Sequence, residues 1–430
     1  MTYGKSIRTI GVLSAALAAV AVPMSAAAEL DTSQPVTLTI TSTSGGLPAL
    51  FNWAAESFQE TYPNVTVEVI DYADDWYNQN AVRLFNSSDR PDLAFFWLTG
   101  FYHTLVDAGV LEPLDDFYVE SGLLDVLPSS SVEVATAADG SKYGVSMSSI
   151  MSPLLMYNKT ALAEAGFEGE PQTMEEFIAM GPALREAGYI PWTSGLANAS
   201  QATQLFDINI RRHTDDETYG KLISKEIMDY TSPDIIEAFS TMQRMAQELM
   251  APGAAGVENL EARGLFAQGR AAFYSDGSWN LGMTNLHGEL PDGFDLGIMP
   301  YPPVSEGSNY TTGLYDANGL VIPRGAQNAD WAKEFIAHIL SYDVQRGMGV
   351  VNAQTPIRVD ITADDLESYH PDIAMIYQRG IANGTHRLFN TIMPGAYRPA
   401  ATQLIQGLVG GQLTPEEFAA EFTAMVASVH

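Results

Sequence analysis

The sequence predicts an α/β protein whose sheets are doubly wound, with helices on both faces. Residues 36–41 (VTLTIT) and 65–70 (VTVEVI) have the alternating, β-branched pattern of strands, and a helical pattern separates them. Residues 92–97 (DLAFFW) form a short, almost entirely apolar run, which is typical of a parallel strand buried on both faces. The order strand, helix, strand, helix, strand indicates the doubly wound arrangement.

The first helix is predicted to follow Ser44-Gly45-Gly46, with Pro48 in its first turn. The residues on its core-facing side are Leu47, Leu50, Phe51, Ala54 and Phe58. After Asp139-Gly140 the pattern restarts, and strands are predicted at 143–149 and 154–157.

The rest of the chain is predicted to be mainly helical, with short strands at 271–275 and 319–322. Helix N-caps are predicted at Thr173, Asn328 and Thr414, because such side chains accept hydrogen bonds from the first helical turn. Thr173 and Thr414 are each followed three residues later by Glu, which predicts a capping box at both helices.

Composition limits the class of protein. The chain has 430 residues, of which 46% are apolar and 17% charged, so it is globular rather than disordered. Lys and Arg number 21 against 52 Asp and Glu, and the formal net charge is −31. Such a surface repels phosphate backbones, so no nucleic-acid partner is expected. The absence of cysteine excludes disulfides, thiolate metal sites and a lipid-modified N-terminal cysteine.

Residues 1–28 have the pattern of a secretory signal peptide. Two basic residues precede the apolar run 10–22, and the small residues 25–28 follow it. This run is too short to cross a bilayer as a helix, which takes about 20 residues. We therefore expect export, cleavage after Ala28, and a soluble protein of the bacterial periplasm.

Motifs for catalysis, cofactors and metals are missing from the sequence. There is no G-x-S-x-G elbow, no H-E-x-x-H and no EF-hand loop. Gly347-Met348-Gly349 begins a dinucleotide fingerprint, but Asn352 stands in place of its third glycine. No two of the seven histidines are spaced i, i+3 or i, i+4, as a helical metal pair would be. We expect no enzyme activity, no cofactor and no metal.

Aromatic residues lie at predicted strand ends and in loops. Trp97 ends a strand, Trp279 lies just past one, and Tyr315 and Tyr397 each lie two residues after a glycine. In open α/β sheets, ligands bind outside the carboxyl ends of the strands. A flat ring there can cover the apolar face of a sugar, while polar side chains bond its hydroxyls. The alternative is that these rings belong to the core.

Four groups of segments resemble the extracellular solute-binding proteins of carbohydrate ABC importers, which include maltose-binding protein. The likeness runs over nearly the whole chain after residue 28. In chain order, the segments are PDLAFFW (91–97) with VDAGVLEPL (106–114), DGSKYG (139–144) with LMYNK (155–159), FAQGRAAF (266–273) with GSW (277–279), and GLVIP (319–323) with AKEF (332–335) and TP (355–356).

The resemblance implies two α/β lobes with a carbohydrate held in a cleft between them, and no chemistry on that ligand. Lobe 1 would comprise 29–147 and 313–356, and lobe 2 would comprise 148–312 and 357–430. A monomer is expected, with two inner-membrane permease subunits and their ATPase as partners.

The ligand-binding residues predicted by position are Ser44, Gly45, Trp97, Trp279, Tyr315, Asp316, Asn318, Tyr397 and Arg398. The resemblance implies that Trp97, Trp279 and Tyr397 are aromatic platforms for the sugar. Ser44 and Gly45 would supply polar contacts near a helix N-terminus, and Asp316 and Asn318 would bond hydroxyls.

Two other functions remain open from the sequence. With the same fold, the cleft would take a phosphate- or carboxylate-bearing solute, such as glycerol-3-phosphate or a uronate, if arginines lined it. The candidate arginines are Arg83, Arg211, Arg212, Arg358 and Arg398. A secreted glycoside hydrolase would instead need two carboxylates about 5–10 Å apart across one cleft.

Overall fold

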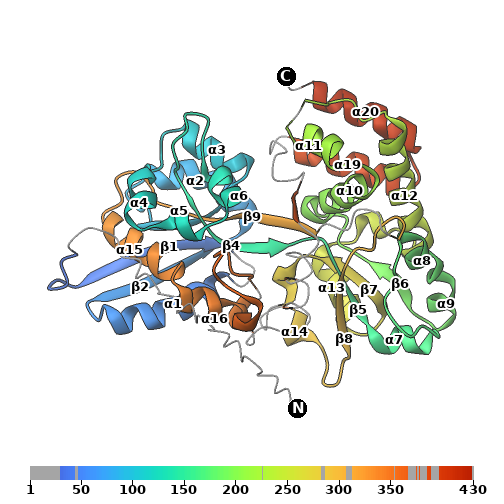
Figure 1. Ribbon diagram of the computed structural model, residues 1–430, viewed down its shortest axis with the longest axis horizontal. Coiled ribbons are helices and arrows are strands. Elements are labelled where there is room, and N and C mark those ends of the chain that lie inside the picture. The colour runs from blue at the N-terminus through green and yellow to red at the C-terminus, as the bar shows by residue number, and fades with distance from the viewer. Residues whose placement is uncertain are drawn as a thin grey trace, which may run out of the picture.

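The fold is known from a computed structural model. It describes residues 30–43, 47–224, 226–281, 286–306, 312–352, 354–366, 374, 377, 385–388 and 397–428. The predicted signal peptide, Ser44 and Gly45 lie outside these residues. Two lobes, each built on its own sheet, lie side by side and are connected by the long strands β4 and β9 (Figure 1).

The first sheet has six strands in the order β10-β9-β3-β1-β2, with β4 paired to β9. They are β1 (Val36–Thr43), β2 (Val65–Tyr72), β3 (Leu93–Trp97), β4 (Val145–Met151), β9 (Thr312–Val321) and β10 (Thr385–Arg387). β1 pairs in parallel with both β2 and β3, as predicted. β9 runs antiparallel to β3 and is longer than the predicted strand at 319–322.

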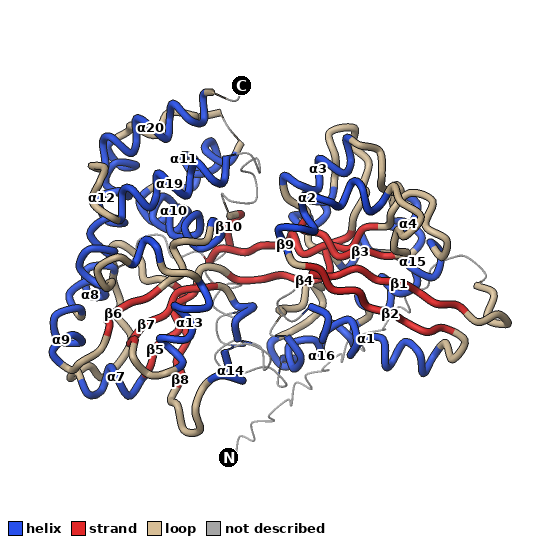
Figure 2. Tube along the Cα trace, turned by 180° about the vertical axis from the view of Figure 1, so that it is seen from behind, coloured by secondary structure: helices blue, strands red, loops and turns tan. Residues whose placement is uncertain are grey.

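Helices cover both faces of this sheet, α1 and α16 on one side and α2 and α3 on the other (Figure 2). The helices of this lobe are α1 (Leu47–Thr61), α2 (Asp74–Phe85), α3 (Gly100–Asp107), α4 (Asp115–Glu120), α5 (Leu123–Val126), α6 (Ser129–Ala135), α15 (Ala329–Ile339) and α16 (Tyr342–Asn352). The predicted core face of α1 is confirmed, because all five of its residues are buried. Phe58 packs edge-on against Phe335, with ring centroids 5.0 Å apart.

The second sheet has the order β6-β7-β5-β8. Its strands are β5 (Leu154–Asn158), β6 (Ile190–Thr193), β7 (Ala271–Asp276) and β8 (Leu296–Pro300). β6 and β7 are parallel, and β5 is antiparallel to both β7 and β8. All five residues of β5 are buried.

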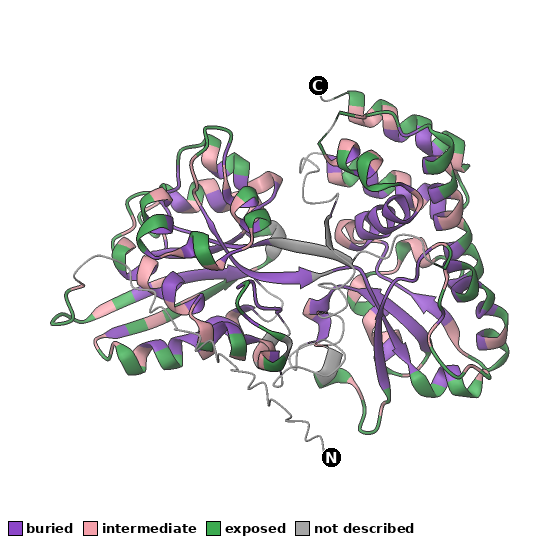
Figure 3. Ribbon diagram, in the orientation of Figure 1, coloured by how far each residue is buried: buried purple, intermediate pink, exposed green. Residues whose placement is uncertain are grey.

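The second lobe is rich in helices. They are α7 (Lys159–Glu164), α8 (Met174–Ala179), α9 (Gly181–Glu186), α10 (Ala199–His213), α11 (Asp216–Ile223), α12 (Pro233–Leu249), α13 (Asn259–Ala267), α14 (Leu286–Glu289), α19 (Arg398–Val409) and α20 (Pro415–Ala427), with short 3-10 turns at η1 (Ala254–Gly256), η2 (Ser278–Leu281) and η3 (Ala363–Leu366). Figure 3 shows α10 buried along most of its length, because α12 and α19 pack around it.

The three predicted helix caps have different hydrogen bonds in the structure. Thr414 forms a complete capping box with Glu417 at the start of α20. Thr173 accepts from the Glu176 backbone, but the Glu176 carboxylate bonds the backbone nitrogen of Gln172 rather than that of Thr173. Asn328 precedes α15 without a side-chain cap; its amide group bonds Asp92, at 3.1 Å, because this carboxylate lies within reach.

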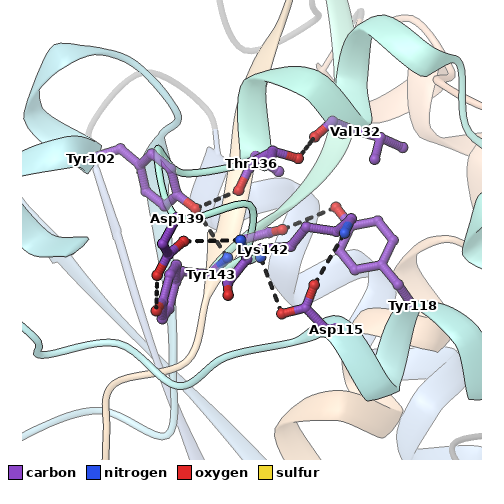
Figure 4. A network of polar contacts seen from close by, with 11 residues as sticks. Tyr102, Asp115, Tyr118, Val132, Thr136, Asp139, Lys142 and Tyr143 are labelled. Carbon is purple, nitrogen blue, oxygen red and sulfur yellow. Dashed lines mark hydrogen bonds and ion pairs between the residues drawn. The ribbon is translucent and has the colours of Figure 1, made fainter.

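A polar network fixes the entry into β4 (Figure 4). The Tyr102 hydroxyl accepts a hydrogen bond from the Tyr143 backbone at 3.1 Å. Lys142 forms an ion pair with Asp115 at 3.0 Å, and its ammonium lies over the Tyr118 ring. The DGSKYG segment therefore ties α3 and α4 to the strand that leaves the first lobe.

Candidate functional site

The carboxyl ends of β1, β2 and β3 lie along one edge of the first sheet. The parallel register sets Thr43 beside Tyr72, and Trp97 ends the strand on the other side of β1. Helices α1, α2 and α3 begin a few residues after these strands, so their N-termini lie near the same edge. This edge is where open α/β sheets bind their ligands.

A group of buried side chains behind this edge is called the edge cluster. Its members include Tyr77, Phe96, Leu98, Tyr102, Ile150 and Ala317. They come from α2, β3, α3 and both long connecting strands, β4 and β9. The edge cluster is the apolar layer between the first sheet and helices α2 and α3, and a residue of the second lobe, Trp279, packs against it.

Trp97 and Trp279 both pack against the edge cluster, each half-buried. Trp97 arrives at the end of β3, with its ring edge-on to Phe95 at 5.1 Å between centroids. Trp279 arrives from the second lobe, in η2 after β7, and η2 also contacts β4. Two predicted platform rings that are far apart in the sequence thus pack against the same buried cluster.

A third aromatic group lies at this edge and was not predicted. The Tyr72 ring, at the end of β2, stacks on Trp76 with centroids 4.8 Å apart and an interplanar angle of 18°. Tyr72 also packs against the edge cluster, and Trp76 is 41% exposed. A signal was available, because Trp76 lies six residues after the predicted strand 65–70, near its carboxyl end.

The last two residues of β1 carry buried hydroxyl groups. The side-chain oxygens of Ser42 and Thr43 are fully buried and have no hydrogen-bond partner within the described residues. Unpaired buried hydroxyls are costly, about 1–3 kcal/mol each. The carboxyl end of β1, just before Ser44 and Gly45, therefore carries polar groups without a partner in the described part of the chain.

Asn318 lies directly opposite Trp97 in the β3–β9 pairing. Its buried amide donates to Gln354 at 2.9 Å and to the Ser148 hydroxyl at 3.3 Å. Ser148 also donates to Gln354 at 2.7 Å. The amide nitrogen of Asn318 is thus engaged with two segments that connect the lobes.

The remaining predicted residues lie apart from the edge cluster or outside the described side chains. Tyr315 and Asp316 belong to β9, whose backbone pairs Tyr315 with Ile150; the side chains of both are outside the described part. Tyr397 precedes α19 and is buried in the helical core of the second lobe, where burial raises its pKa. Arg398, half-buried, begins α19.

No group of three or more His, Asp or Glu side chains among the described residues could hold a metal ion. None of the described helices is long and apolar enough to span a membrane.

A two-lobed α/β fold with aromatic rings from both lobes at their junction defines a class, the solute-binding receptors. The chain belongs to the bacterial extracellular solute-binding protein family, whose model matches residues 40–346. Members of this family are solute-binding components of ABC transporters rather than enzymes.

Individual relatives are distant. An uncharacterised ABC transporter extracellular-binding protein of Pyrococcus horikoshii is 23% identical over 367 residues, which are 84% of this chain and 79% of that protein. A maltotriose-binding protein of Pyrococcus abyssi is 25% identical over 67% of this chain and 58% of its own length. The solved structure of a chitin oligosaccharide binding protein matches 92% of this chain and 98% of its own, with a TM-score of 0.76 and 20% identity. This last match supports the fold.

Proposed function

We propose that the protein is the sugar-binding component of an ABC importer and holds a mono- to oligosaccharide between its two lobes. The observation that carries the proposal is the convergence of Trp97 and Trp279 on the edge cluster from two different sheets. Half-buried rings at a lobe junction suit the apolar face of a sugar.

A neutral sugar is favoured over an anionic solute because three of the five candidate arginines are bonded to partners within the protein. Arg211 bonds Asp216 at 2.5 Å, and Arg212 donates to two backbone carbonyls, including that of Tyr301 at 2.9 Å. Arg358 is paired with Asp360 at 2.6 Å. An arginine already bonded to a carboxylate attracts a second anion less strongly.

The relatives suggest which sugars to test first. One relative is named for maltotriose, and solved structures of similar fold are named for chitin oligosaccharide, α-D-tagatose and raffinose complexes. We propose lobes at 29–147 with 313–356 and 148–312 with 357–430. We also propose a signal peptide at 1–28, a periplasmic location, and delivery of the sugar by a monomer to two permease subunits with their ATPase.

The test is a thermal-shift screen of residues 29–430 against these sugars, galactose, glycerol-3-phosphate and glucuronate. A ligand at 100 times its Kd adds about 2.7 kcal/mol to the free energy of unfolding, so Tm should rise clearly. A shift with neutral sugars supports the proposal, and Trp97→Ala or Trp279→Ala should then reduce it. A shift with anions alone would move the assignment to the anionic alternative, and no shift with any compound would contradict sugar binding.

A further inference from the structure

Asp276 is the last residue of β7 and is fully buried. Five hydrogen-bond donors surround its carboxylate. They are the side chains of Gln201 at 3.0 Å, Asn259 at 2.7 Å, Tyr274 at 2.7 Å and Asn280, and the backbone nitrogen of Gly277 at 2.9 Å. The two carboxylate oxygens thus receive more donors than a neutral side chain of this size could use.

This arrangement fits a carboxylate. Burial raises the pKa of Asp276, and the hydrogen bonds oppose that shift. An amide in this place would turn its NH₂ group toward N–H donors that cannot accept; among the surrounding groups only the Tyr274 hydroxyl, which also lies 2.9 Å from the Asn259 side-chain oxygen, can accept a hydrogen bond. The surrounding groups are therefore arranged for an acceptor with two oxygens.

The donors come from four different elements. Gln201 lies on α10, Asn259 on α13, Tyr274 on β7 and Asn280 on η2. Asn280 is held in addition by Arg263, whose guanidinium donates to the Asn280 side-chain oxygen at 3.1 Å. One carboxylate thus joins the end of a strand to two helices and to the turn that carries Trp279.

The position of the Trp279 ring depends on the turn that Asp276 holds. The ring lies directly against Gly277, where a Cβ atom would come within 1.9 Å of it. Asp276 bonds the backbone nitrogen of Gly277, two residues before this ring, and the side chain of Asn280, the residue after it. The turn is therefore fixed on both sides of Trp279, and the ring is directed onto the edge cluster of the other lobe.

We infer that Asp276 is a positioning residue: its carboxylate sets the orientation of the Trp279 ring at the junction between the lobes. Asp276 itself does not contact the ligand. The importance of this orientation for sugar affinity rests on the proposed function, but the orientation itself does not.

The first test therefore needs no ligand. The chain has six tryptophans, and their ¹⁹F NMR lines after 5-fluorotryptophan labelling can be assigned with single Trp→Phe variants. In Asp276→Asn, the Trp279 line should shift or broaden more than any other, while the line of Trp192, buried in the same lobe, stays in place. An unchanged Trp279 line, or equal changes in all six lines, would overturn the inference.

Two further variants separate positioning from general loss of stability. Asp207 is also a buried carboxylate of the second lobe, bonded to Tyr219, and Asp207→Asn should leave the Trp279 line unchanged. Asn280→Ala removes one side of the attachment and should move the Trp279 line even if Asp276→Asn does not fold. An Asn280→Ala spectrum identical to that of the parent would contradict the inference.

A second readout applies to any sugar that the screen identifies. Asp276→Asn should weaken its binding about tenfold, equivalent to about 1.4 kcal/mol. Added to Trp279→Ala, the same change should cause no further loss, because both act through one ring. Additive losses would overturn the inference. Failure to find a sugar would count against the proposed function alone, since the ¹⁹F lines report the ring directly.

Discussion

At the scale of the residue, Trp76 is the clearest surface for a ligand at the strand ends. Its ring is 41% exposed and stacks on Tyr72, which is itself stacked on the buried Tyr77. Stacking on a fixed partner keeps an exposed ring in one orientation, so less conformational entropy is lost when a ligand packs against it.

We predict that Trp76→Ala weakens binding of an identified sugar about three- to tenfold, with little change in Tm. Aromatic contacts contribute about 0.5–1.5 kcal/mol beyond their buried area, and an exposed ring contributes little to the core. Isothermal titration calorimetry measures the first quantity and thermal unfolding the second. Leu260→Ala is the control, because Leu260 is 71% exposed and lies on α13 of the second lobe rather than at the strand ends of the first sheet. Equal affinities for the parent and Trp76→Ala would exclude this ring from the site.

A second prediction concerns acid stability and His213. Burial lowers the pKa of this imidazole, which bonds the Asn209 carbonyl at 2.8 Å and Thr241 at 3.0 Å. A lowered folded pKa means that the unfolded chain takes up the proton first. The stabilisation is therefore present above the unfolded pKa of about 6.5 and is lost as pH falls through the folded value.

The measurement is Tm between pH 7.5 and 5 for the parent and for His213→Gln, which does not titrate. The variant should lose less stability over this range, whatever its Tm at pH 7.5. His103→Gln is the control, since His103 is exposed on α3. Parallel pH curves for the parent and His213→Gln would show that His213 does not contribute.

The site residues show how far a sequence predicts side-chain roles. Trp97 and Trp279 could be found because strand ends and local motifs are visible in the chain. The partner of Asn318 could not be, because Gln354 reaches it only after the chain has crossed between the lobes. Asp276 was missed for the same reason, since its donors are distributed over four elements.

At the scale of the element, the helix starts combine local and tertiary effects. Thr414 and Glu417 need only each other, so the sequence predicted their capping box correctly. Asn328 was predicted to cap α15, but a nearby carboxylate, Asp92, binds its side chain instead. Strand order was likewise predictable where strands are neighbours in sequence, whereas the antiparallel β9 joins β3 from a distant part of the chain.

We predict that Thr414→Ala lowers the free energy of unfolding by about 1 kcal/mol, because it removes the cap of α20. In a chain of this size, that corresponds to a fall in Tm of roughly one degree. Ser232→Ala is the matched control: Ser232 also precedes a helix with proline at its start, but its side chain makes no cap hydrogen bond. Equal losses in urea unfolding of the two variants would show that the capping box contributes nothing specific.

At the scale of the whole molecule, the charge balance should make stability depend on salt. A net charge of −31 produces self-repulsion in the compact state, and the Debye length falls from about 30 Å at 0.01 M to about 3 Å at 1 M ionic strength. We predict a higher Tm in 1 M than in 0.01 M NaCl, measured by thermal unfolding at pH 7.5. The same rise with KCl would identify screening as the cause, and a flat or falling Tm would contradict it.

The strands that connect the lobes also constrain the order in which the chain folds. All four strands of the second sheet lie between Leu154 and Pro300, so that sheet can form before the residues after Pro300 are synthesised. The first sheet, in contrast, is complete only when β9 has paired with β3 and β10 has paired with β9. During synthesis from the N-terminus, the first strands of the first lobe are therefore made early, and its last strands are made only after the second sheet. Until Thr312–Val321 emerges, β3 has an unpaired edge, and the nascent protein depends on protection from aggregation there.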